Sequence, residues 1–226
     1  FYDESPGQRR TDKIFDETAV VGVQEFASRL QAGIVPTFAR WADFQAGSEI
    51  PPEQKPEINL ELDKITDYVF QILQTSNFNQ EIHEAFMDLA IGTGVMLVEE
   101  GDAINPIKFS SIPLTRVCLN NGPDGAIDTV YRTRYCKPDE INILYPKAVL
   151  PENFDPLRQT KKIKIVEAVY KIYEPNVEKY KLCVVMEDPK HILFEETYTG
   201  EGANPYLVFR WNKASGEVYG RGPVFN

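Results

Sequence analysis

The chain has 226 residues, of which 42% are hydrophobic and 12% aromatic, so it is long enough and apolar enough to bury a core. It carries 34 Asp and Glu residues against 24 Lys and Arg residues, a net charge of −10. Such an acidic chain repels a phosphate backbone, which argues against tight DNA binding but is compatible with DNA passing an acidic wall. Because no apolar run reaches the roughly 18 residues of a membrane span, we expect no membrane partner.

Both ends of the chain are typical of a piece of a longer protein. The first residue is Phe1 and not Met, and the last, Asn226, comes three residues after a turn that leads into a helix start. We therefore expect a fragment. Its residues 1–15 are mostly polar and without periodicity, which predicts an extended arm.

The next part of the chain, residues 16–93, predicts three amphipathic helices. The first begins at Asp16 and ends between Gly33 and Pro36. The second follows the loop 47–52, and its apolar residues form one stripe with acidic residues opposite. The stripe consists of Ile58, Leu62, Ile65, Val69, Ile72 and Leu73. The third helix is predicted to begin at the N-cap Asn79 and to end near Gly92.

From residue 94 the period changes to that of strands, interrupted by one short helix at 138–145 and a proline-rich loop at 146–160. The cluster 121–125 predicts a tight turn between two paired strands. The predicted strands are 95–99, 107–110, 116–120, 127–135, 163–173, 179–186, 191–195 and 206–211, and the last four are expected to form an antiparallel meander. Helices followed by strands predict an α+β fold, with one domain over 16–226.

Few residues of this chain suggest chemistry. Cys118, Cys136 and Cys183 are too far apart for a zinc or redox motif, which predicts buried free thiols. The two histidines, His83 and His191, have no partner at metal-ligand spacing and are interpreted as surface or satisfied core residues. We therefore name no catalytic, metal or cofactor-binding residue.

Three further groups of residues have both a plain and a functional interpretation. Acidic pairs at 99–100, 187–188 and 195–196 are typical of solvated strand ends, although such pairs supply acid and base in hydrolases. The run Arg158–Lys164 is the one basic stretch, and a solvated loop is favoured over phosphate binding. The glycines of Gly92–Gly94 favour a helix stop over a dinucleotide loop, which needs the opposite order of strand and helix.

The most informative motif lies near the end of the chain. An aromatic strand, 206–211, is followed by a segment in which Arg221 stands between two glycines and before a proline. Its residues Tyr219, Gly220, Arg221, Gly222 and Pro223 are the candidate site. The strand is predicted to hold this segment against a sheet, and Pro223 suits a helix start. Arg221 crosses a subunit boundary to an acidic partner, makes a local salt bridge or is a free side chain.

These motifs resemble the head-to-tail connector, or portal, proteins of short-tailed bacteriophages. The resemblance covers nearly the whole chain in the right order, and the terminal motif is its most specific part. It rests on the early helix 16–36 followed by Trp41, on 83–99, on 109–135, and on 205–211 followed by 217–223. The resemblance implies a wing-domain fragment without the stem, clip and crown, in which 219–223 sits where the wing meets the stem.

The resemblance also implies a function. Portal proteins are not enzymes but subunits of a ring, usually a dodecamer, at one capsid vertex of the virion, assembled in the host bacterial cytoplasm. Double-stranded DNA is packaged and ejected through the ring without tight binding, and the partners are the terminase, the capsid or scaffolding protein and the tail adaptor. A virion or adhesion module without a channel is the alternative, and a hydrolase that uses an acidic pair is a third hypothesis.

Overall fold

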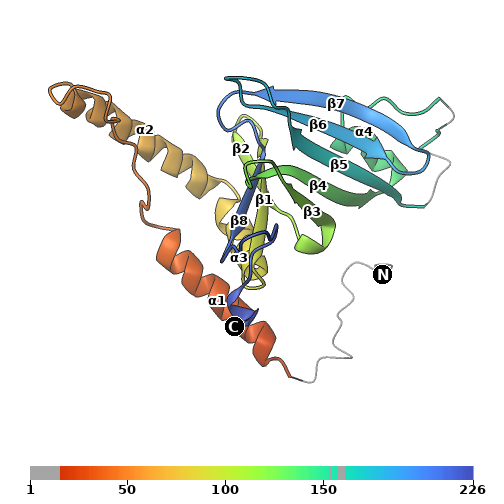
Figure 1. Ribbon diagram of the computed structural model, residues 1–226, viewed down its shortest axis with the longest axis horizontal. Helices are drawn as coiled ribbons and strands as arrows, with labels where there is room; N and C mark the ends of the chain where they lie inside the picture. The colour runs from red at the N-terminus through yellow and green to blue at the C-terminus, as the bar shows by residue number, and fades with distance from the viewer. Residues whose placement is uncertain (1–15, 153, 157–160, 226) are drawn as a thin grey trace.

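A computed structural model describes residues 16–152, 154–156 and 161–225, and places three helices before two antiparallel sheets (Figure 1). The long helices are α1 (Thr18–Ile34), α2 (Lys55–Thr75) and α3 (Phe78–Leu89), and the short α4 (Ile141–Leu144) follows a 3-10 turn, Pro138–Glu140. The strands are β1 (Thr93–Glu100), β2 (Ile107–Ser111), β3 (Val117–Asn121), β4 (Ile127–Cys136), β5 (Ile163–Lys171), β6 (Lys179–Met186), β7 (His191–Thr199) and β8 (Tyr206–Arg210). The α+β prediction is confirmed, while the predicted arm at 1–15 lies outside the described residues.

The strands divide into a three-stranded sheet, β2-β1-β8, and a five-stranded sheet, β3-β4-β5-β6-β7. The meander is therefore confirmed for β5, β6 and β7, and the predicted turn at 121–125 joins β3 to β4. The expectation that 206–211 continues the meander is wrong, because β8 pairs with β1, for example Val208 with Val95. β1 is buried along most of its length, so both of its edges need a hydrogen-bonded neighbour, and β2 supplies only one.

Helices α1 and α3 cover the three-stranded sheet. Ile82, Phe86 and Leu89 of α3 are buried in one cluster with Met96 of β1 and Phe109 of β2. Helix α1 joins this cluster through Ala27 and Leu30. The i, i+3, i+4 spacing of these residues places them on one face of each helix. This face is buried against the sheet, as the amphipathic pattern predicted.

The predicted N-cap of α3 is wrong by two positions. The helix begins at Phe78, so Asn79 lies inside it and Asn77 occupies the N-cap. Asn77 caps no helical N–H, because its side-chain amide is taken by the backbone of Phe109, with Nδ2 to the carbonyl at 2.7 Å and Oδ1 to the N–H at 3.0 Å. The residue thus fixes the start of α3 to strand β2.

The five-stranded sheet has one covered face and one bare face. On the inner face, Ile163, Ile165 and Met186 pack against α4 and the segment that follows it. Further along the same face, Val130 and Val169 pack against β1 and β8 of the other sheet. The outer face, formed by the alternating residues of the same strands, carries no helix within the described chain.

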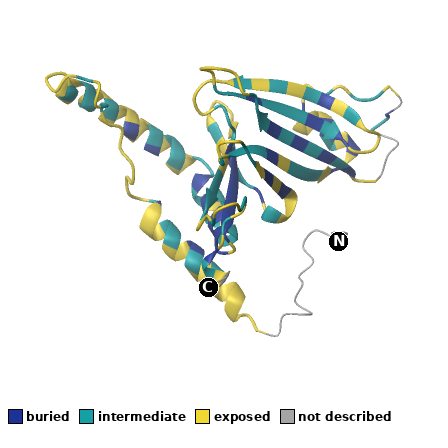
Figure 2. Ribbon diagram, in the orientation of Figure 1, coloured by how far each residue is buried: buried dark blue, intermediate teal, exposed yellow. Residues whose placement is uncertain are grey.

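Helix α2 extends away from the rest of the molecule, and it is mostly exposed or half-buried (Figures 1 and 2). Its two buried residues are Thr66 and Phe70. Both face the segment before the helix, where the Phe44 N–H donates to Thr66 Oγ1 at 3.2 Å and the Trp41 ring meets Phe70 edge to face. Of the predicted apolar stripe, only Leu73 packs against a core cluster of the described residues.

Candidate functional site: the glycine junction

The candidate segment 219–223 packs against the turn that joins α3 to β1, and we call the two together the glycine junction (Tyr219–Pro223 with Ala90–Thr93). Three of its backbone N–H groups donate to neighbouring chain segments. The Gly220 N–H donates to Thr93 Oγ1 at 2.8 Å and the Gly222 N–H to the Ile91 carbonyl at 2.9 Å. The Arg221 N–H donates to the Asn212 carbonyl at 2.8 Å. The segment is therefore held mainly by its backbone.

The absence of side chains at three glycines makes this packing possible. A Cβ at Gly220 would lie 2.2 Å from the carbonyl oxygen of Gly92, and a Cβ at Gly92 would lie 2.1 Å from the carbonyl oxygen of Gly220. At Gly222 the obstacle is the Ala90 carbonyl oxygen, at 2.0 Å. Because each clash is with backbone, no rotamer change relieves it. Gly92 also ends the helical part with a φ of 142°, which agrees with the predicted helix stop.

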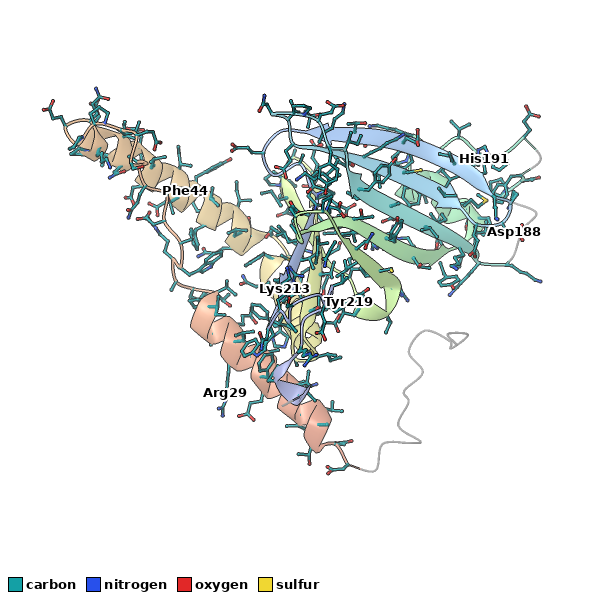
Figure 3. The ribbon with its side chains drawn as sticks, viewed as in Figure 1. Arg29, Phe44, Asp188, His191, Lys213 and Tyr219 are labelled. Carbon is teal, nitrogen blue, oxygen red and sulfur yellow. The ribbon has the colours of Figure 1, made fainter. Side chains whose placement is uncertain are left out.

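Tyr219 connects the junction to the five-stranded sheet. Its hydroxyl accepts the N–H of Leu119 in β3 at 3.0 Å, and partial burial raises the pKa of the phenol. Lys213 makes a second connection, from its Nζ to the Gly125 carbonyl in the β3–β4 turn at 2.9 Å. Figure 3 places Tyr219 and Lys213 in the middle of the molecule, where the two sheets meet. The segment after β8 therefore touches both sheets.

The Arg221 side chain is the exposed part of the junction. Its Nε donates to Glu217 Oε2 at 3.0 Å, and its guanidinium makes a second contact with the same carboxylate. This neighbour raises the pKa of Arg221, and the guanidinium lowers the pKa of Glu217. Of the three interpretations from the sequence, the local salt bridge is present and the free side chain is wrong. Because 62% of the Arg221 side chain is exposed, a partner can still reach it.

The chain leaves the junction through a helical turn, as the sequence predicted. Pro223 begins a 3-10 turn, Pro223–Phe225, as expected for a proline in the first turn of a helix. The junction and α1 flank the same part of the sheet, because Trp211, just after β8, meets the Phe26 ring edge to face at 5.3 Å. The end of the described chain therefore lies beside α1 (Figure 1).

A buried polar cluster between the two sheets was not found from the sequence. Glu167 of β5 is only 6% exposed, and its carboxylate accepts hydrogen bonds from Tyr145 and Tyr206. Arg132 and Arg134 of β4 supply the positive charge. The signal was available, because Glu167 occupies an inward position between Ile165 and Val169 in an alternating strand. Burial and this carboxylate raise the pKa of both tyrosines.

Most of the other candidates for chemistry have structural partners. His83 Nδ1 lies 3.0 Å from Gln31 Oε1 and His191 Nε2 lies 2.9 Å from the Val149 carbonyl, so the interpretation of satisfied histidines is confirmed. In the acidic pairs, Glu187 is bound by Lys164, and Glu195 by Lys181. Glu196 is bound by Lys147, whereas Glu99 and Glu100 are exposed.

The cysteines are free, but the prediction that all are buried is wrong. Cys136 is buried, Cys183 is half-buried and Cys118 is exposed, because Cys118 and Cys183 point to the outer face of the five-stranded sheet. Within the described residues, no three His, Cys, Asp or Glu side chains gather as metal ligands. No helix in that part of the chain is long and apolar enough to cross a membrane.

The comparisons with known proteins identify the family of the chain. The model of the family described as bacteriophage head to tail connecting protein matches residues 1–226. The chain therefore belongs to this connector family, which confirms the resemblance found in its motifs. A search of curated proteins found no match.

Proposed function

We propose that this chain is part of a subunit of a phage portal ring, through which double-stranded DNA is packaged into the capsid and later ejected into the tail. The observation that carries the proposal is the family match over residues 1–226. In this proposal the connector is a ring at one capsid vertex of the virion, where it joins the capsid to the tail. The ring is assembled in the host bacterial cytoplasm.

The charge of the chain supports a conduit more than a DNA-binding protein. With a net charge of −10, the chain repels the phosphate backbone, and each lysine–phosphate contact avoided removes one obstacle to sliding. Several of its lysines are already bound to carboxylates, for example Lys147, Lys164 and Lys181. These ion pairs leave the cations less available to phosphates.

Residues 16–226 fit the role of the wing, the peripheral part of a portal subunit, as a single domain. In this proposal the glycine junction lies where the wing meets the stem, and the rigid backbone contacts at Gly220 and Gly222 fix the direction in which the chain continues after Pro223. The partners are further copies of the chain in a ring, with twelve as the proposed number, together with the terminase, the capsid or scaffolding protein and the tail adaptor.

Electron microscopy of the natural gene product tests the proposal. We expect ring-shaped particles with a central hole, and a mass by light scattering that is a multiple of the subunit mass. Particles that stay single at every concentration contradict a portal and favour the alternative, a virion or adhesion module without a channel. An infection in which the gene is inactivated is expected to yield capsids without DNA.

Arg221 is the junction residue proposed to reach a neighbouring subunit or the stem. Arg221→Ala is expected to weaken ring assembly while leaving the melting temperature nearly unchanged, because the side chain is exposed. Glu217→Gln is the matched control, since it breaks the local pair but keeps the guanidinium. If both variants lower assembly equally, the local pair is what matters; if neither does, Arg221 has no role in assembly.

A further inference from the structure

Helix α2 and the segment before it form one structural unit, residues 38–75, which we call the arm. The segment runs back along the helix and is bound to it at several points. The Phe44 N–H donates to Thr66 Oγ1 at 3.2 Å, and the Ala46 N–H donates to Asn59 Oδ1 at 2.8 Å. These bonds join the backbone of the segment to side chains of α2. The arm can therefore change its direction without changing its internal structure.

The contacts between the arm and the rest of the described chain are sparse by comparison. Leu73 packs against the core cluster of α1, α3 and the three-stranded sheet, and the Trp41 ring stacks on that of Phe78 at 6.2 Å. Both contacts lie at the base of the arm. Its far end, where the loop 47–54 leads into α2, extends away from the rest of the molecule (Figure 1). Within the described chain, the direction of the arm is therefore set at its base.

The chain enters and leaves the arm through two short joints, residues 35–37 and 76–77. In each joint the backbone departs from the helical conformation, since Val35 has a φ of −131° and a ψ of 61°, and Ser76 has a ψ of 177°. Next to the arm, both joints are fixed in the same core cluster, which contains Val35 and Phe78. Domain hinges are built from a few such residues at the ends of helices or strands.

An open cleft beside the second joint leaves room for movement. Its volume is about 440 Å³, and it separates the end of α2 from the turn between β1 and β2. Thr75 and Ser76 line one side of the cleft, and Asp102, Asn105 and Lys108 line the other. Because these side chains are polar, the cleft can narrow or widen without exposing them at the cost that apolar surface carries in water.

We propose that the arm swings as one body about the two joints, on a base formed by α1, α3 and the three-stranded sheet. Asn77 anchors the second joint to this base, because its side chain binds the backbone of Phe109 in β2. The swing is a property of the single chain and does not depend on the proposed ring. A partner that contacts the tip would select one direction of the arm from those that the joints allow.

Distances between pairs of spin labels test the swing in the natural gene product, diluted until its subunits are separate. Cys118→Ser and Cys183→Ser first remove the two thiols that are not buried. Glu53→Cys, at the exposed tip, with Lys190→Cys, in the turn between β6 and β7, reports the direction of the arm. Gln24→Cys in α1 with Lys190→Cys is the matched control across two packed parts. We expect the arm–sheet distances to be spread over a range about twice as wide as the control distances.

A third pair of labels tests whether the arm moves as one body. Ala42→Cys with Glu53→Cys lies wholly within the arm, and its distances are expected to be spread no more widely than those of the control. Arm–sheet distances as narrow as the control overturn the proposal, because the arm is then fixed. Within-arm distances as wide as the arm–sheet distances overturn it as well, because the segment then separates from α2 and no rigid arm exists.

Asn77→Ala tests the position of the second joint. The Asn77 side chain binds the Phe109 carbonyl at 2.7 Å and its N–H at 3.0 Å, so its loss releases the first turn of α3 from β2. We expect the arm–sheet distances to spread over a range about half as wide again. Asn79→Ala is the matched control, since Asn79 lies inside α3 and the described residues bind its carbonyl and not its side chain. Circular dichroism establishes that both variants keep their helices. Equal distance distributions in the two variants overturn the proposal, because Asn77 then does not anchor the arm.

Discussion

Helices α2 and α3 are neighbours in the chain, and both are amphipathic, but their surroundings differ. In its 12 residues α3 buries five: Phe78, Ile82, Ala85, Phe86 and Leu89. In its 21 residues α2 buries only Thr66 and Phe70. The difference is what each apolar face meets. Strands β1 and β2 cover that of α3, while only Leu73 of the predicted apolar stripe of α2 packs against a core cluster of the described residues. An amphipathic pattern therefore indicates that a face needs a partner, and not that the same chain supplies it.

The contacts that hold α2 in place are mostly polar. Arg40, from the preceding segment, is bound by Asp43, Asp63 and Asp67. These groups are exposed enough that water and salt screen their attraction, so such pairs stabilise a helix little. We therefore expect α2 to open locally while α3 opens only with the whole domain, a difference that amide hydrogen exchange measures. Four substitutions sharpen this contrast, from the largest expected effect to the smallest.

The largest effect is expected in α3. Phe86 is 5% exposed and its ring meets that of Phe209 edge to face at 6.0 Å. Phe86→Ala removes these contacts and leaves a cavity, which is expected to lower the free energy of unfolding by about 3–5 kcal/mol. Urea unfolding followed by circular dichroism measures the loss. Phe86→Leu keeps most of the apolar volume and should cost clearly less; equal losses from both variants would contradict a packed site.

The glycine junction is expected to come next. Gly220→Ala places a methyl group 2.2 Å from the Gly92 carbonyl oxygen, so backbone has to move, which costs about 1–3 kcal/mol by analogy with overpacked cores. Gly33→Ala in α1 is the control, because nothing lies within 4 Å of its Cβ position. In a helix that change stabilises by about 0.5–1 kcal/mol. A junction variant as stable as the control would mean that the close approach contributes nothing.

The cluster around Glu167 gives an alkaline dependence of intermediate size. Burial first, and then the Glu167 carboxylate, raise the pKa of Tyr206 above its usual 10.0, so the folded state favours the neutral phenol. The contribution of the neutral Tyr206 phenol to the free energy of unfolding is complete below pH 10. It is lost as the pH rises through the higher pKa of the folded state. Tyr206→Phe is expected to lower the free energy of unfolding by about 1 kcal/mol at about pH 7, because a hydrogen bond is lost. The stability of this variant is expected to fall less than that of the natural protein as the pH becomes alkaline. Parallel stability curves for both proteins would contradict this.

Much of the fold follows from local pattern. The periodicity of α3, the turn before β4 and the proline that begins the last 3-10 turn are all determined by neighbouring residues, and they were predicted within a few positions. The candidate segment was also recognised from glycine and proline alone. Its three-glycine contact was not, because Gly92 and Gly220 are brought together only by the pairing of β8 with β1.

The errors have a common physical origin in contacts between distant residues. The edge that β8 joins is set by the burial of β1, which lies far earlier in the chain. The N-cap of α3 is Asn77 and not Asn79, and the Asn77 side chain is held by the backbone of Phe109, which lies 32 residues later in the chain. Cys118 is exposed because the outer face of its sheet has no cover within the described residues. In each case the residues suit the helix or strand that they form. What the sequence does not show is which distant segment packs against them.

The smallest effect is expected at Ile65, in the predicted apolar stripe of α2. Ile65→Ala removes a side chain that is half in water and introduces a better helix former, so the free energy of unfolding of the isolated chain should change by no more than about 0.5 kcal/mol. Ile82→Ala in α3, at 6% exposure, is the matched change and is expected to cost about 2–5 kcal/mol. Urea unfolding below the concentration at which subunits associate measures both. A loss at Ile65 as large as that at Ile82 would mean that this face of α2 is packed within its own chain as tightly as the buried face of α3.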